Sequence, residues 1–137
     1  MGFDTAFDPL ARDADLAARA AREGRILLTR DRALLMHREV THGCYIRQSG
    51  LAAQLEYLIR RLDLCGSVRP FTRCMRCNGL LRPAGRAEVA DLVPPGVRRS
   101  QEHFWRCRDC AQVYWRGSHY RRLAAEVERL CGGGSRQ

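Results

Sequence analysis

The chain has 137 residues, of which 45% are apolar and 28% charged, and its formal net charge is +9. This composition excludes a disordered segment, because enough apolar surface is present to offset the entropy of ordering the backbone. No run approaches the roughly 18 consecutive apolar residues of a membrane helix, and the first residues lack the pattern of a secretion signal or of myristoylation, so we expect a soluble, cytoplasmic protein without membrane association.

The positive charge is concentrated in the second half of the chain and is carried by arginine alone, since the sequence contains no lysine. Residues 1–66 carry ten Arg and nine acidic residues, a net charge of +1, whereas residues 67–137 carry fourteen Arg and six acidic residues, a net charge of +8. A GC-rich genome could produce the preference for arginine over lysine, but it does not explain why the excess of positive charge is confined to one half. The asymmetry therefore predicts a phosphate-binding surface in residues 67–137.

The first half is predicted to alternate strands and helices. The expected elements are a short strand at residues 3–7, a helix from Asp13 that stops at Gly24, a buried strand at 25–29 (RILLT), a helix at 32–40, a strand at 44–46 and a helix at 51–64. The last helix is strongly amphipathic, with apolar residues at helical spacing. This alternation is typical of an α/β layer with a parallel sheet.

The pattern changes near residue 67, where we place a domain boundary. We expect an α/β domain at 1–66, a second domain at 67–131 and a flexible tail at 132–137. The second domain is predicted to contain a short helix in RAEVADL (86–92), a turn at PPG (94–96) and an amphipathic helix at 118–130 with Ser118 as its N-cap.

Four cysteines predict a zinc ribbon. Cys74 and Cys77 form one C-x2-C pair, Cys107 and Cys110 form a second, and 29 residues separate the pairs. Two residues between thiolates let both sulfurs bind one ion, and two such pairs complete the tetrahedral shell of a structural Zn²⁺. Redox pairs or disulfides are the alternatives. Neither pair opens a helix after a strand, where a lowered thiol pKa would favour redox chemistry.

The remaining cysteines, Cys44, Cys65 and Cys131, have no partner motif. We expect them to be buried small apolar residues or free thiols. Gly79, two residues after the first pair, suits the tight turn of a zinc knuckle.

Aromatic residues and arginines alternate around the second cysteine pair, in FWR (104–106) and VYWRGSHY (113–120). Such side chains can stack on bases and contact phosphates, as in single-strand binding proteins. The alternative is that Phe104, Trp105, Tyr114 and Trp115 form the small core of the ribbon. His119 is interpreted as a phosphate contact or as a residue of the first helical turn.

These segments together resemble a known family. RILLTRD, RPFTRCMRCNG, FWRCRDC and VYWRGSHY are similar to motifs of the Mut-seven C-terminal RNase domain family. The resemblance covers residues 2 to about 130 and implies a PIN-like α/β layer followed by a zinc ribbon. In that family the PIN-like layer is taken to cut RNA with clustered acids that hold Mg²⁺ or Mn²⁺.

The resemblance assigns site residues one by one. The Asp of the TRD motif corresponds to Asp31, beside Arg30, and the acid that opens the preceding helix corresponds to Asp13, with Asp15 one step inside. The ribbon motifs correspond to the four paired cysteines. Both Asp13 and Asp31 could instead be helix N-caps, a role that Asp favours.

The family usually has a strand ending in Asp, then a helix rich in Leu and Arg, before the segment that corresponds to GFDT (2–5). The present chain begins at that segment, so we expect a truncated sheet that lacks one metal-binding acid. A second copy or a protein partner could complete such a sheet.

The sequence therefore supports two functions. The first is a Mg²⁺- or Mn²⁺-dependent endoribonuclease, in which Asp31, Asp13 and Asp15 form the catalytic site. RNA would be bound by basic residues, namely Arg30, Arg73, Arg106, Arg116 and His119. The alternative is a non-catalytic zinc-ribbon module that binds RNA or a protein.

Overall fold

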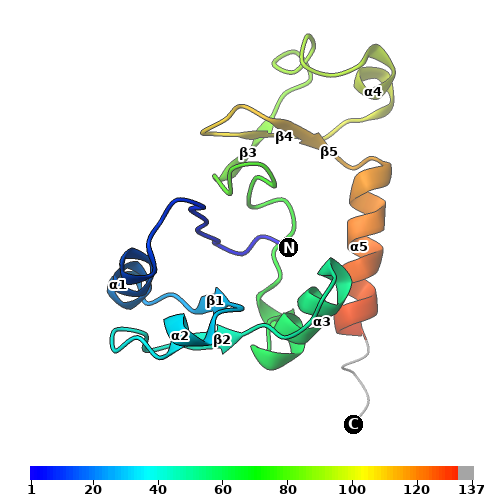
Figure 1. The fold of residues 1–137 in the computed structure, drawn as a ribbon. Helices are drawn as coiled ribbons and strands as arrows, with labels where there is room; N and C mark the ends of the chain where they lie inside the picture. The colour runs from blue at the N-terminus through cyan, green and yellow to red at the C-terminus, as the bar shows by residue number, and fades with distance from the viewer. Residues whose placement is uncertain (133–137) are drawn as a thin grey trace. The chain divides into compact units, whose positions relative to one another are not determined.

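The computed structural model describes residues 1–132, which fold into two compact units (Figure 1). The first, Phe7–Arg61, is called the α/β unit here, and the second, Met1–Ala6 with Leu62–Gln137, is called the ribbon unit. Most of the tail expected at 132–137 lies outside the described residues. The units are defined by contacts, so the boundary expected near residue 67 stays a prediction about independently folding domains.

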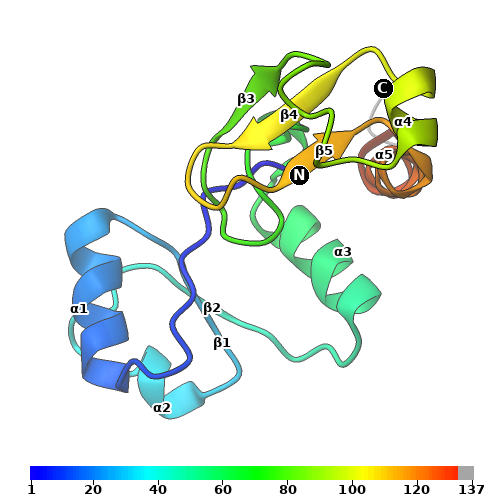
Figure 2. The same cartoon turned by 90° about the horizontal axis from the view of Figure 1, so that it is seen from above.

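The α/β unit contains three helices and a two-stranded parallel sheet. Its elements are α1 (Asp13–Glu23), β1 (Leu27–Thr29), α2 (Arg32–Leu35), β2 (Gly43–Tyr45) and α3 (Leu51–Arg61). Strand β1 pairs in parallel with β2, with Leu28 opposite Cys44, and α1 contacts both β1 and α2 (Figure 2). The predicted mixed α/β class and parallel pairing are confirmed.

Helix α1 follows from its sequence pattern. Ala17 and Ala20 are fully or almost fully buried on its inner face, and the helix ends at Gly24, whose left-handed φ of 62° lets its N–H reach the carbonyls of Ala20 and Ala21. The N-cap is Arg12, not Asp13, and no side chain caps the helix. Asp13 therefore occupies the first turn, where its charge favours the helix dipole.

Three predictions for the first 66 residues were wrong. Residues 3–7 form no strand; residues 1–6 belong to the ribbon unit, where the Asn78 side chain accepts a hydrogen bond from the Thr5 N–H and donates one to the Phe3 carbonyl. The strand in RILLT is not buried, because Leu28 is 42% exposed in a sheet that has two described strands. Helix α2 stops at Leu35, and beyond it the Glu39 N–H bonds the His37 ring and not a helical carbonyl.

The ribbon unit is built on a three-stranded antiparallel sheet in the order β3-β4-β5 (Figure 2). Its elements are η1 (Cys65–Ser67), β3 (Leu81–Ala84), α4 (Pro95–Ser100), β4 (Phe104–Cys107), β5 (Val113–Trp115) and α5 (Ser118–Cys131). The core consists of Val89, Val93, Phe104 and Val113. Three of these four residues, Val89, Val93 and Phe104, belong to the insert between the cysteine pairs.

The insert differs from the prediction in its local structure. Residues 86–92 form turns and no helix, although Val89 among them is completely buried. The PPG segment opens a helix instead of a turn: Pro94 is the N-cap of α4 and Pro95 its first residue, a position where the missing N–H is not needed. Helix α5 begins at Ser118 with Gly117 as N-cap, so Ser118 is not the cap.

The prediction for Cys65 and Cys131 was also wrong, because the two form a disulfide with their Cα atoms 5.4 Å apart. The bond joins η1 to the end of α5, elements 66 residues apart in the chain. Cys44 is buried, as expected. No helix within residues 1–132 has the length and apolar character needed to span a bilayer.

Candidate functional site

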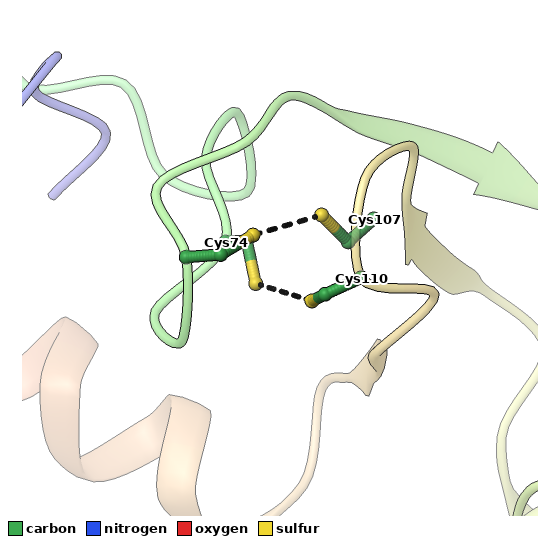
Figure 3. A group of neighbouring side chains, drawn as sticks. Cys74, Cys107 and Cys110 are labelled. Atoms are coloured by element: carbon green, nitrogen blue, oxygen red, sulfur yellow. Dashed lines mark hydrogen bonds between the residues drawn. The ribbon is translucent and has the colours of Figure 1, made fainter.

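The four paired cysteines come together at one end of the ribbon sheet. Cys74 and Cys77 lie in the loop before β3, Cys107 ends β4, and Cys110 lies in the turn to β5. All four sulfurs are within 4.8 Å of one another, and Cys74 to Cys110 and Cys77 to Cys107 are 3.6 and 3.5 Å apart. Figure 3 shows the side chains of the two loops pointing toward one another.

This arrangement fits zinc. Zn–S bonds of about 2.3 Å in a tetrahedron place the sulfurs roughly 3.8 Å apart, close to the distances found here. Both loops also have the same local form: the N–H of Arg76 points to the Cys74 sulfur and that of Asp109 to the Cys107 sulfur, each at 3.4 Å. Such amide hydrogen bonds stabilise thiolates. The cysteine cluster could therefore hold one Zn²⁺.

The residue after each pair has a left-handed backbone. Asn78 has φ 62° and Ala111 has φ 60°, a conformation that Asn tolerates and Ala does not favour. Gly79 was predicted to form the tight turn, but the need for glycine at this position is steric. A Cβ on Gly79 would lie 3.1 Å from the Cys107 sulfur and still closer to the Asp109 carboxylate.

Tyr114 supports the site and was missed as a site residue by sequence reasoning. Its hydroxyl lies 3.1 Å from the Cys74 sulfur and accepts a hydrogen bond from the Met75 N–H at 3.0 Å. Burial and the bond to Cys74 raise the pKa of Tyr114 to about 12, so the hydroxyl keeps its proton and donates it toward the sulfur. No sequence signal marks this role, because an aromatic residue in β5 fits a core position equally well.

The thiols of the cluster ionise unequally. Burial disfavours ionisation of Cys74, but hydrogen bonds from Tyr114 and from backbone amides outweigh it and lower the pKa of Cys74 to about 6. The Gly79 amide favours the Cys77 thiolate, yet the neighbouring sulfurs of Cys107 and Cys110 raise the pKa of Cys77 to about 12. Several thiolates so close together require a cation, and four of them leave no open position for catalysis.

The aromatic residues divide between core and surface. Phe104 is buried and Trp115 packs against the core. Phe71 stacks on Trp105 with ring centroids 4.1 Å apart and lies 4.8 Å from Tyr120. The Arg116 guanidinium lies over both Trp105 and Tyr120, at 5.6 and 5.7 Å. The predicted mixture of arginine and aromatic rings therefore exists as a stacked cluster.

The other basic candidates differ in whether they form ion pairs with acidic residues. Arg106 is 3.0 Å from Glu88, which also pairs with Arg82. These two arginines lower the pKa of Glu88 to about 2. Arg73 lies 3.4 Å from Asp4. His119 is exposed in the first turn of α5, and Arg30 is exposed after β1.

The acidic candidates lie in the α/β unit and are exposed. Asp31 follows β1 and caps α2: its Oδ1 accepts from the Ala33 N–H at 2.7 Å, while its own N–H donates to the Thr29 hydroxyl at 2.9 Å. Asp15 pairs with Arg12 at 2.9 Å. Within residues 1–132 the four cysteines are the single group of three or more metal-ligating side chains. A role of Asp13, Asp15 and Asp31 in binding a second metal stays a prediction.

The chain matches one protein-family model over most of its length. The Mut7-C RNAse domain model matches residues 1–127, which include all three acidic candidates and all four zinc-ligand candidates. No match was found among curated proteins or among solved structures. Because the family model covers nearly the whole sequence, the chain belongs to the Mut7-C RNAse domain family.

Proposed function

We propose that the protein is a metal-dependent endoribonuclease of PIN-like type that acts on RNA in the cytoplasm. The observation that carries the proposal is the family match over residues 1–127. It is supported by the position of Asp31, two residues after the end of the parallel strand β1. In open α/β sheets, ligands bind beyond the carboxyl ends of the strands.

Asp31 can serve as a cap and as a metal ligand at once. One carboxylate oxygen accepts the Ala33 N–H, and the second has no hydrogen-bond partner within residues 1–132. The Thr29 hydroxyl holds the backbone of Asp31 at the end of the strand. Asp13, in the first turn of α1, is the proposed second ligand, and Asp15 is a further acid of the same turn. A bound Mg²⁺ or Mn²⁺ would supply an activated water and stabilise the leaving oxygen.

The ribbon unit is the proposed RNA-binding part. Its zinc would build the fold, and its arginines would contact phosphates. Arg116 is the best-placed of these, because it is exposed and held over two aromatic rings. Arg106 is less free, since a phosphate has to compete with Glu88 for it.

The test separates capping from metal binding at Asp31. Asn caps helices about as well as Asp but carries no charge. We expect Asp31→Asn to fold normally and to lose at least roughly 100-fold in Mn²⁺-dependent cleavage of labelled RNA, a loss typical of removing one charge-stabilising group. Asp91→Asn, an exposed acid of the ribbon unit, is the matched control. Unchanged cleavage by Asp31→Asn, or no cleavage by the wild type, contradicts the proposal.

A non-catalytic RNA-binding or protein-interaction module is the second candidate, and one observation favours it. Within the described part of the chain, no three carboxylates gather as metal ligands. This candidate predicts RNA affinity that survives Asp31→Asn but falls after charge reversal at Arg106 and Arg116. A pure protein-interaction module predicts no RNA binding.

A further inference from the structure

A cavity of about 650 Å³ lies in the ribbon unit beside the cysteine cluster. Its walls come from the loop before β3, from β5 and from α5. The apolar wall includes Phe71, Tyr114, Trp115, Tyr120, Leu123 and Val127. A cavity of this size accommodates a small organic group such as a nucleotide.

The aromatic wall is held in place by stacking and by an unusual backbone. Phe71 has φ 56°, a left-handed conformation that bulky residues rarely adopt. Its ring stacks on Trp105 and also contacts the ring of Tyr120. Such conformations persist where the surrounding structure imposes them, and they cluster at ligand sites. The wall is therefore a preformed set of rings that can receive a flat, apolar ligand face.

The part of the cavity wall at the start of α5, called the cationic end here, favours an anion. Gly117, Ser118 and His119, at the start of α5, line it, and no side chain caps this helix. The first N–H groups of a helix attract negative charge. Arg76 also lines the cavity, is exposed, and has no ion-pair partner within residues 1–132. The residues that form the cavity wall include no Asp or Glu.

We infer that this cavity binds one unpaired nucleobase of single-stranded RNA, with its phosphate at the start of α5 and near Arg76. A flat ring with an attached phosphate matches an aromatic wall that adjoins a cationic end. An apolar peptide would leave the cationic end unused, and a base inside a duplex is already stacked. The inference rests on the proposed function, in which RNA is the ligand, and names single-stranded RNA as its class.

The first test uses intrinsic fluorescence. The chain has two tryptophans; Trp115 lines the cavity and Trp105 stacks on Phe71. We expect a single-stranded RNA oligomer to quench this fluorescence and to bind roughly tenfold tighter than an abasic oligomer of equal length, since one stacked base contributes about that factor. A duplex of the same length should behave like the abasic strand. Salt is kept constant, because phosphate contacts depend on it.

Two matched pairs of variants locate the binding. Ala124 lines the cavity, whereas Ala125 is its exposed neighbour on α5 and does not. We expect Ala124→Leu to fill the cavity and abolish the preference for bases, and Ala125→Leu to leave it unchanged. Ser118→Asp places a carboxylate at the anion end while favouring the helix dipole, so it should weaken binding of the base-bearing strand without unfolding α5. Ser118→Asn is its neutral control.

The outcomes distinguish this inference from the proposed function. Equal binding of base-bearing and abasic strands, or equal effects of Ala124→Leu and Ala125→Leu, overturns the inference even if RNA is cleaved. Base-dependent quenching in a protein that cleaves no RNA supports the inference and removes the nuclease proposal. Absence of binding to any RNA overturns both.

Discussion

Replacing Tyr114 by Phe tests whether the zinc site depends on its second layer of contacts. The substitution keeps the ring in β5 and removes the hydroxyl that lies 3.1 Å from the Cys74 sulfur. It also removes the acceptor of the Met75 N–H, but Met75 is exposed and water can replace that bond. The main loss is therefore the hydrogen bond to the thiolate. Losses of this kind weaken metal binding by roughly 10- to 100-fold, or about 1.4 to 2.7 kcal/mol.

The effect should depend on pH. Burial opposes ionisation of Cys74, but Tyr114 and the backbone amides lower its pKa from 9.0 to about 6. In the metal-free protein this ionisation stabilises the fold fully above pH 9.0 and loses its effect as the pH falls toward 6. Without the hydroxyl the pKa of Cys74 rises, so zinc must displace a proton that the wild type has already released. The difference in zinc affinity between the wild type and Tyr114→Phe should therefore be larger at pH 6.5 than at pH 8, two assay conditions on either side of neutrality.

Competition with a chromophoric chelator measures the zinc affinity at both pH values. Tyr120→Phe is the control, because the Tyr120 ring belongs to the same unit and its hydroxyl has no hydrogen-bond partner within residues 1–132. We expect Tyr120→Phe to bind zinc as the wild type does. An affinity of Tyr114→Phe within about threefold of the wild type at both pH values, well short of the expected loss, would refute the reasoning.

Three further predictions follow from the ribbon unit. Replacing both Cys65 and Cys131 by Ser should lower the free energy of unfolding by about 4 kcal/mol, which is the chain-entropy value for a loop closed across 66 residues. Urea unfolding of the wild type and the double variant measures this difference, and an unchanged midpoint would argue against the disulfide. Glu88→Gln should release Arg106 from its ion pair and raise the affinity for RNA. The decrease of RNA affinity with salt should also become steeper, by the equivalent of about one phosphate contact. Unchanged affinity in a salt titration would mean that Arg106 does not contact RNA. Ala111→Gly should stabilise the zinc-loaded protein by about 1 kcal/mol, because Gly adopts the φ of 60° without a Cβ penalty; equal or lower stability in thermal unfolding would exclude strain at this turn.

The zinc-ligand candidates could be found from the sequence because the information is local. Two residues between cysteines bring the sulfurs of each pair onto one ion, and one sheet unites the pairs. The helices α1, α3 and α5 could likewise be predicted from the periodicity of apolar residues, because a helix that packs on one side has its apolar residues at helical spacing. The short helix expected at residues 86–92 does not form, and Val89 is buried within a segment of turns.

The partners of individual side chains were decided by the tertiary structure. Cys65 and Cys131 pair because α5 brings its end back to η1, and Tyr114 joins the cysteine cluster because β5 places its hydroxyl against the first cysteine loop. Asp31 depends on both the sequence and the tertiary structure. The TRD sequence alone predicts a carboxylate after a strand, while the fold determines which of its oxygens caps α2. Periodicity and motif spacing act over a few residues, and so they determine the helices and the cysteine knuckles. Contacts between residues distant in the chain depend on how the elements pack, which no local pattern specifies.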